Sequence, residues 1–264
     1  MRGSPDEMVL AQALANFTQQ VAVPIIWHDA ASGWPRTVYG ATCFFVRFPH
    51  GIIGITADHV IGALQLAMIK NPNIICQLRT SKAVDLLDLV VDRCPQWDIA
   101  TFRISEELLD AIGGIAVDCT SDWPPPEPAK GRAVTFCGFP EAERVVLEPA
   151  ALSIFACGSL TVIEAVTERD IILTYDPSQD EPAPWAPWAQ PLGYNMSGCS
   201  GGPVLSHGTR NGLQRSFLVG MVVAGPRGTG TGEAEGFDIL RMRRIYAVEP
   251  DGMIRRTNSG WLPR

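Results

Sequence analysis

The sequence of 264 residues has little of what marks membrane or nucleic-acid-binding proteins. No stretch approaches the ~20 apolar residues that a membrane-spanning helix needs. Residues 1–17 carry acidic side chains early and lack a long apolar core, which excludes a signal peptide. The net charge of −7 excludes the basic surface of a nucleic-acid-binding protein. We interpret the short cluster of Arg241, Arg243 and Arg244 as a solvated face.

The cysteines form no metal-binding pattern. The chain has seven of them, at positions 43, 76, 94, 119, 137, 157 and 199, and an odd number cannot all pair within one chain. Their scatter contains no Cys-x-x-Cys pair, which argues against structural zinc. We therefore expect free thiols in a cytoplasmic protein, with no metal site and no cofactor.

The apolar segments predict two β-rich halves joined by a proline-rich linker. With 46% apolar and 19% charged residues, the composition is that of an ordinary globular protein. Pro5 to Gln20 has helical spacing, and the runs after it are short, apolar and separated by Gly, Pro and Asn, as in closely spaced strands. The expected divisions are a helical lead-in (1–20), a first half (21–120), a linker (121–130), a second half (131–250) and a tail (251–264).

Two of these runs make specific local predictions. FVRFPHGIIGIT predicts a hairpin that turns at residues 49–51. DLLDLVV, at residues 85–91, predicts a strand. No internal repeat is visible in the sequence.

Residues 195–203 read NMSGCSGGP, a turn in which glycines cluster around Ser200. Glycine persists at such density where the backbone must take positive φ or approach another group closely. A serine hydroxyl becomes a nucleophile when a histidine, oriented by a carboxylate, takes its proton. His59 follows an apolar strand and begins a helical turn, and Asp98 enters an apolar run where a purely structural charge would be poorly placed. We expect the other three histidines to lie at the surface: His28, His50 and His207.

Three blocks, in the order His59, Asp98 and Ser200, resemble the chymotrypsin-like (trypsin-fold) serine peptidases: ITADHV, DIA and GCSGGP. The resemblance covers roughly residues 20–250 and implies an all-β fold of two six-stranded antiparallel β-barrels with a short N-terminal helix. His59 and Asp98 would come from the first barrel and Ser200 from the second, with the active site in the cleft between them. The backbone amides of Gly198 and Ser200 would form the oxyanion hole.

The chain departs from the secreted digestive members at two positions. Cys199 stands where they have the aspartate that pairs with a new N-terminal ammonium, so that activation switch cannot operate here. Asp58 stands where they have a disulfide cysteine. The chain is therefore closer to the intracellular bacterial, HtrA-like branch, without a PDZ domain. Cys199 is followed by Ser200 and not by two glycines, so we expect it to be a packing residue and not the nucleophile.

By the family pattern, Tyr194 would form the floor of the substrate pocket, and Val223, Ala224 and Gly225 its wall. No acidic residue stands at the floor. We therefore expect a small or medium apolar side chain, and not a basic one, before the cleaved bond.

The segment just upstream, residues 176–195, is rich in proline, acid and tryptophan. This loop would order the oxyanion hole or grip a partner, or Trp185 and Trp188 would only cap the end of a barrel. Both interpretations stay open.

The resemblance implies a serine endopeptidase that hydrolyses peptide bonds through an acyl-enzyme. Its substrate would be a protein or peptide, and an activating protein partner or assembly would gate it. The same fold also supports a catalytically silent protein-binding module, because function depends on the site and not on the scaffold. The intact triad blocks favour the enzyme.

Overall fold

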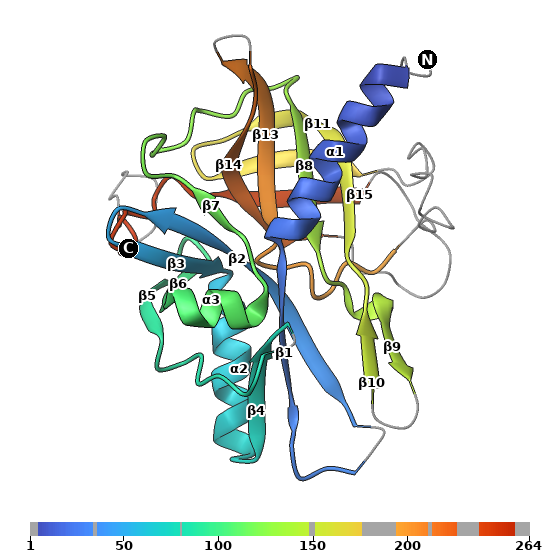
Figure 1. Ribbon diagram of the computed structural model, residues 1–264, viewed down its shortest axis with the longest axis vertical. Helices are drawn as coiled ribbons and strands as arrows, with labels where there is room; N and C mark the ends of the chain where they lie inside the picture. Colours follow the sequence, from blue (N-terminus) through green and yellow to red (C-terminus); the bar gives the residue numbers. More distant parts are fainter. Residues whose placement is uncertain are drawn as a thin grey trace.

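A computed structural model of the chain describes residues 5–33, 36–79, 81–147, 151–175, 194–210, 213–225 and 238–256. They form two β-rich halves, with the N-terminal helix α1 (Pro5–Val21) lying across the upper one in Figure 1. The expected lead-in helix is thus confirmed, and it packs mainly against β8 (Ala133–Gly138). Within the described ranges, no helix is both long and apolar enough to cross a membrane.

The N-terminal half is a seven-stranded sheet with two helices, α2 (Asp58–Lys70) and α3 (Glu106–Ile112). Six strands follow the order β4-β1-β2-β3-β6-β5, and β7 joins β2 in parallel. The strands are β1 Val23–Asp29, β2 Val38–Phe48, β3 Gly51–Thr56, β4 Ile74–Leu78, β5 Val90–Cys94, β6 Ile99–Ile104 and β7 Ala116–Asp118. The predicted hairpin is confirmed, because β2 and β3 pair on either side of a turn at residues 49–50.

The C-terminal half is a closed barrel of antiparallel strands, in the order β11-β12-β15-β14-β13-β8. The remaining barrel strands are β11 Cys157–Val166, β12 Asp170–Tyr175, β13 Pro203–Arg210, β14 Leu213–Ala224 and β15 Asp238–Arg244. A separate hairpin, β9 (Arg144–Leu147) and β10 (Ala151–Ile154), follows the short 3-10 helix η1 (Glu141–Glu143) and extends downward in Figure 1.

One of the two predicted six-stranded barrels is therefore confirmed, whereas no second closed barrel occurs among the described residues. The strand predicted at residues 85–91 begins only at Val90, because residues 86–89 form a turn. Leu86 in this turn is fully buried, so the apolar character there reflects a loop side chain that packs in the core. As a result, β4 and β5 end the sheet path without meeting.

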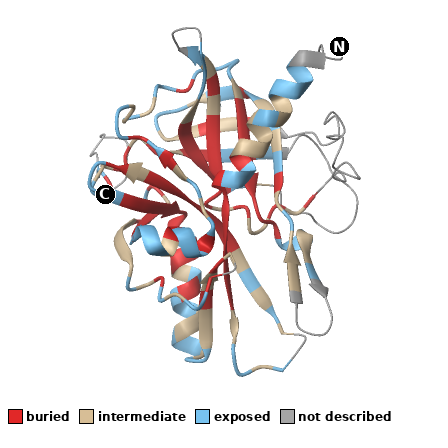
Figure 2. Cartoon of the chain, viewed as in Figure 1, coloured by how far each residue is buried: buried red, intermediate tan, exposed pale blue. Residues whose placement is uncertain are grey.

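The two halves share one hydrophobic core through β14. Leu218, Met221 and Val223 pack with the core of the N-terminal sheet, whereas Val219 and Val222 pack inside the barrel. Successive side chains of a strand point to opposite faces, so a strand buried on both faces reads as a continuous apolar run. The buried strands at the centre of Figure 2 mark this junction.

Buried polar groups tie α1 to the barrel. The hydroxyl oxygens of Thr18 and Thr135 are 2.5 Å apart, and Thr135 Oγ1 lies 2.7 Å from His207 Nε2. His207 Nδ1 lies 3.0 Å from Ser216 Oγ, so both ring nitrogens have hydroxyl partners. Burial lowers the pKa of His207 to about 4.

The expectation that three histidines lie at the surface is therefore wrong for His207, which is 8% exposed. Its sequence neighbours are polar, but β8 and β14 cover it from both sides. His28 is half-buried, and His50 is exposed in the hairpin turn.

We expect His207 to make the protein less stable as the pH falls from 6.5 to about 4. In this interval the unfolded state binds a proton at His207 that the folded state does not bind, so acidification favours unfolding. The loss should be on the order of 2 kcal/mol. Urea unfolding of the wild type and of His207→Gln, at about pH 7.5 and about pH 4.5, measures it. Stability should change less between the two pH values in the variant, and an equal change in both proteins would contradict this role.

Candidate active site

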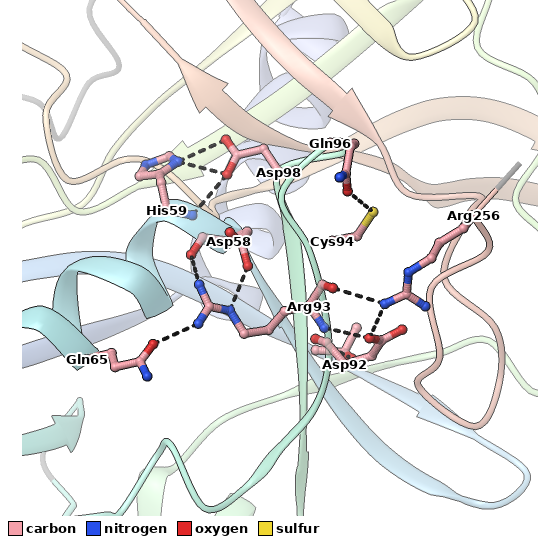
Figure 3. A network of polar contacts seen from close by, with 10 residues as sticks. Asp58, His59, Gln65, Asp92, Arg93, Cys94, Gln96, Asp98 and Arg256 are labelled. Atoms are coloured by element: carbon pink, nitrogen blue, oxygen red, sulfur yellow. Dashed lines mark hydrogen bonds and ion pairs between the residues drawn. The ribbon is translucent and has the colours of Figure 1, made fainter. Parts of the chain in front are cut away.

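His59 and Asp98 lie side by side at the start of α2 (Figure 3). The Asp98 carboxylate oxygens are 2.9 and 3.0 Å from His59 Nδ1, and one of them also accepts the His59 backbone N–H at 3.0 Å. A carboxylate accepts hydrogen bonds, so Nδ1 carries the proton and Nε2 keeps its lone pair. The imidazole is 50% exposed and the carboxylate 25%. The histidine is thus oriented and still reachable from solvent.

Ser200 lies in a tight turn, residues 197–202, directly before β13. Gly201 in this turn has a φ of +86°, which L side chains rarely adopt. A Cβ at this position would also collide with Thr42 and Thr56 of the N-terminal half. Both the backbone conformation and the close approach therefore require glycine next to the serine.

Thr42 of β2 docks this turn on the N-terminal half. Its N–H donates to Ser200 O at 2.9 Å, and its hydroxyl donates to Gly198 O at 2.9 Å. The Thr42 carbonyl accepts the hydroxyl of Thr56, the last residue of β3, at 2.7 Å. Because α2 and His59 follow Thr56 almost directly, these bonds bring the serine turn close to the histidine. Both threonines are fully buried, and only Thr56 had a sequence signal, through the ITADHV block.

Several groups of the serine turn and of His59 have no hydrogen-bond partner among the described residues. Ser197 O accepts the Glu141 N–H at 2.6 Å, and in a trans peptide the Gly198 N–H then points the opposite way. Neither the Gly198 N–H nor the Ser200 N–H donates a hydrogen bond to any described residue. Ser200 Oγ and His59 Nε2 likewise bond neither each other nor another group in the described part of the chain. A nucleophile, a base and two amide donors are thus left for a ligand.

A buried ion pair holds the first turn of α2 against β5. Arg93 Nε lies 2.7 Å from Asp58 Oδ1, and Arg93 Nη1 donates to Gln65 Oε1 at 3.0 Å (Figure 3). The Asp58 side chain is only 9% exposed, so the loss of either partner would leave a costly unpaired charge. Asp58 directly precedes His59. An ion pair therefore anchors the residue directly before the histidine.

The C-terminal segment continues this network on the other side of β5. Asp92 accepts the Ile254 N–H at 2.9 Å and Arg256 Nη2 at 2.6 Å. Burial alone would raise the pKa of Asp92, but the hydrogen bonds from Arg256 and from backbone N–H groups hold that pKa below its ordinary value. Since Asp92 adjoins Arg93, the segment that ends at Arg256 supports the strand that anchors α2 (Figure 3).

Arg243 fixes the Asp98 turn to the barrel. It is 7% exposed, so the interpretation of the arginine cluster as a solvated face is wrong for this residue. Arg243 Nη1 donates to Trp97 O at 2.6 Å, and its Nε forms an ion pair with Asp170 at 2.8 Å. Asp98, the next residue, has a left-handed φ of 52°. The turn that contains Trp97 and Asp98 covers Arg243. Of the three arginines in the cluster, only Arg241 is exposed as predicted.

The residues predicted to line a substrate pocket differ in exposure. Tyr194 is 6% exposed, and its hydroxyl donates to Glu143 Oε1 at 2.7 Å. Burial raises the pKa of Tyr194. Val223 packs in the shared core, whereas Ala224 is exposed and Gly225 is half-buried. Of the predicted wall, only Ala224 and Gly225 thus reach solvent.

Cys199 lies in the core of the barrel and is fully buried. Burial raises the pKa of its thiol well above the ordinary value, which disfavours the reactive thiolate. Trp185 and Trp188, with the rest of residues 176–193, lie outside the described residues. In the part of the chain that is described, no group of three or more His, Cys, Asp and Glu residues could hold a metal ion.

No family model and no curated protein sequence matches the chain. Among solved structures, the fold is similar to the crystal structure of the serine endoprotease from Yersinia pestis, with 15% identity and a TM-score of 0.43. The match covers 91% of this chain and 62% of that one. This chain therefore spans less than two thirds of the length of that protein.

We expect Arg243→Met to lower the free energy of unfolding by about 3 kcal/mol, because it leaves the Asp170 carboxylate and the Trp97 carbonyl without their partner. Arg241→Met is the matched control on the same strand and should change stability by less than about 0.5 kcal/mol. Urea unfolding of the three proteins measures both values. Equal stability of the two variants would contradict the assignment of Arg243.

Proposed function

We propose that this protein is a serine endopeptidase of the chymotrypsin-like type with the triad Ser200, His59 and Asp98. The observation that carries the proposal is the His59–Asp98 pair, with the histidine oriented by two hydrogen bonds to one carboxylate. The serine turn docked beside it supports the same arrangement, and so do the ITADHV, DIA and GCSGGP blocks. Two members of the triad come from the N-terminal half, His59 on α2 and Asp98 in the turn before β6, and the third precedes a barrel strand.

In the proposed reaction, Ser200 Oγ attacks the carbonyl carbon of a peptide bond while His59 Nε2 takes the hydroxyl proton. Asp98 holds the imidazole in the tautomer that leaves Nε2 free to accept it. Collapse of the tetrahedral intermediate breaks the C–N bond, and His59 returns the proton to the leaving amine. Water, activated by the same histidine, then hydrolyses the acyl-enzyme.

The negative charge of the tetrahedral intermediate would be bound by the N–H groups of Gly198 and Ser200. Their lack of acceptors in the described structure supports this role. Gly198 has a φ of +101°, and a Cβ there would lie 2.6 Å from Phe139 O. One such donor contributes about 2.7 to 4 kcal/mol of transition-state stabilisation. Glycine at position 198 therefore allows the backbone conformation that directs the Gly198 N–H towards the oxyanion, in addition to allowing the turn.

The proposed reaction needs a hydrogen bond between Ser200 and His59. In the described structure these two side chains are not hydrogen-bonded to each other. Catalytic hydrogen bonds are often long in free enzymes and shorten when substrate binds. We propose that a protein or peptide substrate, an activating partner or assembly completes the contact. We also place the enzyme in the cytoplasm, which its seven buried thiols suit.

For the substrate, we propose a small or medium apolar side chain before the cleaved bond. Ala224 and Gly225 are the part of the proposed wall that reaches solvent, and neither carries a polar side chain. Tyr194 and Val223 lie behind them as buried support. Glu143 near the floor already accepts the Tyr194 hydroxyl, so its carboxylate is engaged.

A catalytically silent binding module is the second candidate. The observation that favours it is the missing hydrogen bond between Ser200 Oγ and His59 Nε2 within the described residues. A scaffold that only binds peptides would have no need of that bond.

Reaction with a fluorophosphonate probe distinguishes the two candidates. The wild type should gain the mass of one probe at Ser200, and Ser200→Ala should gain none, because only an activated serine reacts. His59→Ala should slow labelling by at least about a hundredfold. Ser197→Ala, in the same turn, is the matched control and should label at the wild-type rate. A folded wild type that does not label would favour the binding module.

The Asp58–Arg93 ion pair should set the labelling rate by positioning His59. Asp58→Arg and Arg93→Asp should each slow labelling about tenfold to a hundredfold, because small displacements of a catalytic group are costly. The double variant restores opposite charges and should recover part of the rate. Arg47→Met breaks the ion pair with Glu106, far from the site, and controls for general loss of an ion pair. Wild-type rates in both single variants would contradict this role.

A further inference from the structure

Arg144, the first residue of β9, is a half-buried arginine without an acidic partner. Its Nη1 donates to Val38 O at 3.0 Å. No carboxylate of the described residues lies within ion-pair distance of it. A guanidinium has five N–H donors, so most of its hydrogen-bonding capacity is unused.

Four other covered arginines have more partners than Arg144. Arg93, Arg243 and Arg244 each form an ion pair with a carboxylate. Arg79 has no carboxylate but places both terminal nitrogens on backbone carbonyls, at 2.7 and 3.0 Å. Among the described residues, half-buried Arg144 thus engages a single acceptor and forms no ion pair.

Burial lowers the pKa of Arg144, and the more distant carboxylate of Glu141 offsets this only in part. An arginine cannot escape the cost of burial by losing its proton. A partly desolvated charge of this kind is stabilised by a close opposite charge, and no described carboxylate lies within ion-pair distance of Arg144.

The unused side of the guanidinium lies beside the serine turn. A Cβ on Gly198 would be 2.9 Å from Arg144 Nη2, and a Cβ on Gly40 would be 3.1 Å from it. Gly198 supplies one of the proposed oxyanion donors, and Gly40 lies on β2 next but one to Thr42, which holds Ser200. Because Gly198 and Gly40 have no side chains, the Arg144 guanidinium has room to lie against the serine turn.

The serine turn separates Arg144 from the proposed pocket. On one side, the Gly201 N–H donates to Val222 O of β14, the strand whose end forms the pocket wall. On the other side, Thr42 of β2 donates to Ser200 O. A peptide whose residue before the cleaved bond lies at the end of β14 therefore passes over β2 and Arg144 after the bond.

We infer that Arg144 selects substrates with an acidic side chain, Asp or Glu, in the first positions after the cleaved bond. The inference rests on the proposed function and names the substrate class of the same site. A carboxylate can accept two N–H groups of one guanidinium, which gives both charge neutralisation and a fixed geometry. The acid would supply the counter-charge that the described residues do not.

The test uses pairs of internally quenched peptides that are cleaved by the full-length protein. Within a pair, only one residue changes, Glu to Gln or Asp to Asn, in the first, second or third position after the cleaved bond. At one of these positions the acidic peptide should have a kcat/KM at least about tenfold higher. This ratio should fall as the salt concentration rises, because screening weakens a partly exposed charge pair.

Variants of Arg144 separate recognition from folding. In Arg144→Met the ratio should fall towards one, in Arg144→Lys it should be partly kept, and in Arg144→Glu lysine should be preferred over the acid. Arg47→Met is the control and should keep the wild-type ratio. Thermal unfolding identifies variants that do not fold. The salt dependence is measured on the wild type, so it tests the proposal even if every variant fails to fold.

Two failures are distinguishable. Cleavage of acidic and neutral peptides at equal rates, or an acidic preference that Arg144→Glu retains, overturns the role of Arg144 alone. A folded protein that cleaves no peptide and does not react with the fluorophosphonate overturns the proposed function and this inference together.

Discussion

The candidate site depends on the hydrogen bonds of one buried residue, Thr42. Its amide and hydroxyl donate to the serine turn, its hydroxyl also accepts the Phe139 N–H at 2.9 Å, and its carbonyl accepts Thr56. Groups buried this deeply are expensive to leave unpaired. A displacement of the barrel against the sheet would break several of these bonds at once. The distance between the serine turn and the histidine helix is therefore coupled to the packing of the whole molecule.

The sequence could predict the candidate site residues because their chemistry restricts residue type and local backbone together. Gly201 must be glycine for both φ and space, and His59 must follow the end of a strand. Such constraints act over a few residues, so they remain visible in a short motif. The N-terminal helix and the hairpin at residues 49–51 were predictable for the same reason.

Features that depend on distant neighbours were not predictable. Arg243 and His207 stand in polar stretches that resemble surface, and only the turn before Asp98 and the hydroxyls of Thr135 and Ser216 bury them. Closure of a sheet depends on whether its two end strands meet, and a buried loop residue such as Leu86 imitates a strand residue. Thr42 gave no signal at all, since a threonine in an apolar strand is ordinary.

The backbone at Asp98 restricts which acid can serve the histidine. With a φ of 52°, this residue occupies a region that aspartate and asparagine enter far more readily than longer side chains, because a short polar side chain can bond locally. Glutamate has the same charge, but it would meet a conformational penalty and its carboxylate would lie one methylene farther from its Cα. The position therefore requires a suitable backbone shape as well as a charge. Of the two acidic amino acids, the turn admits one.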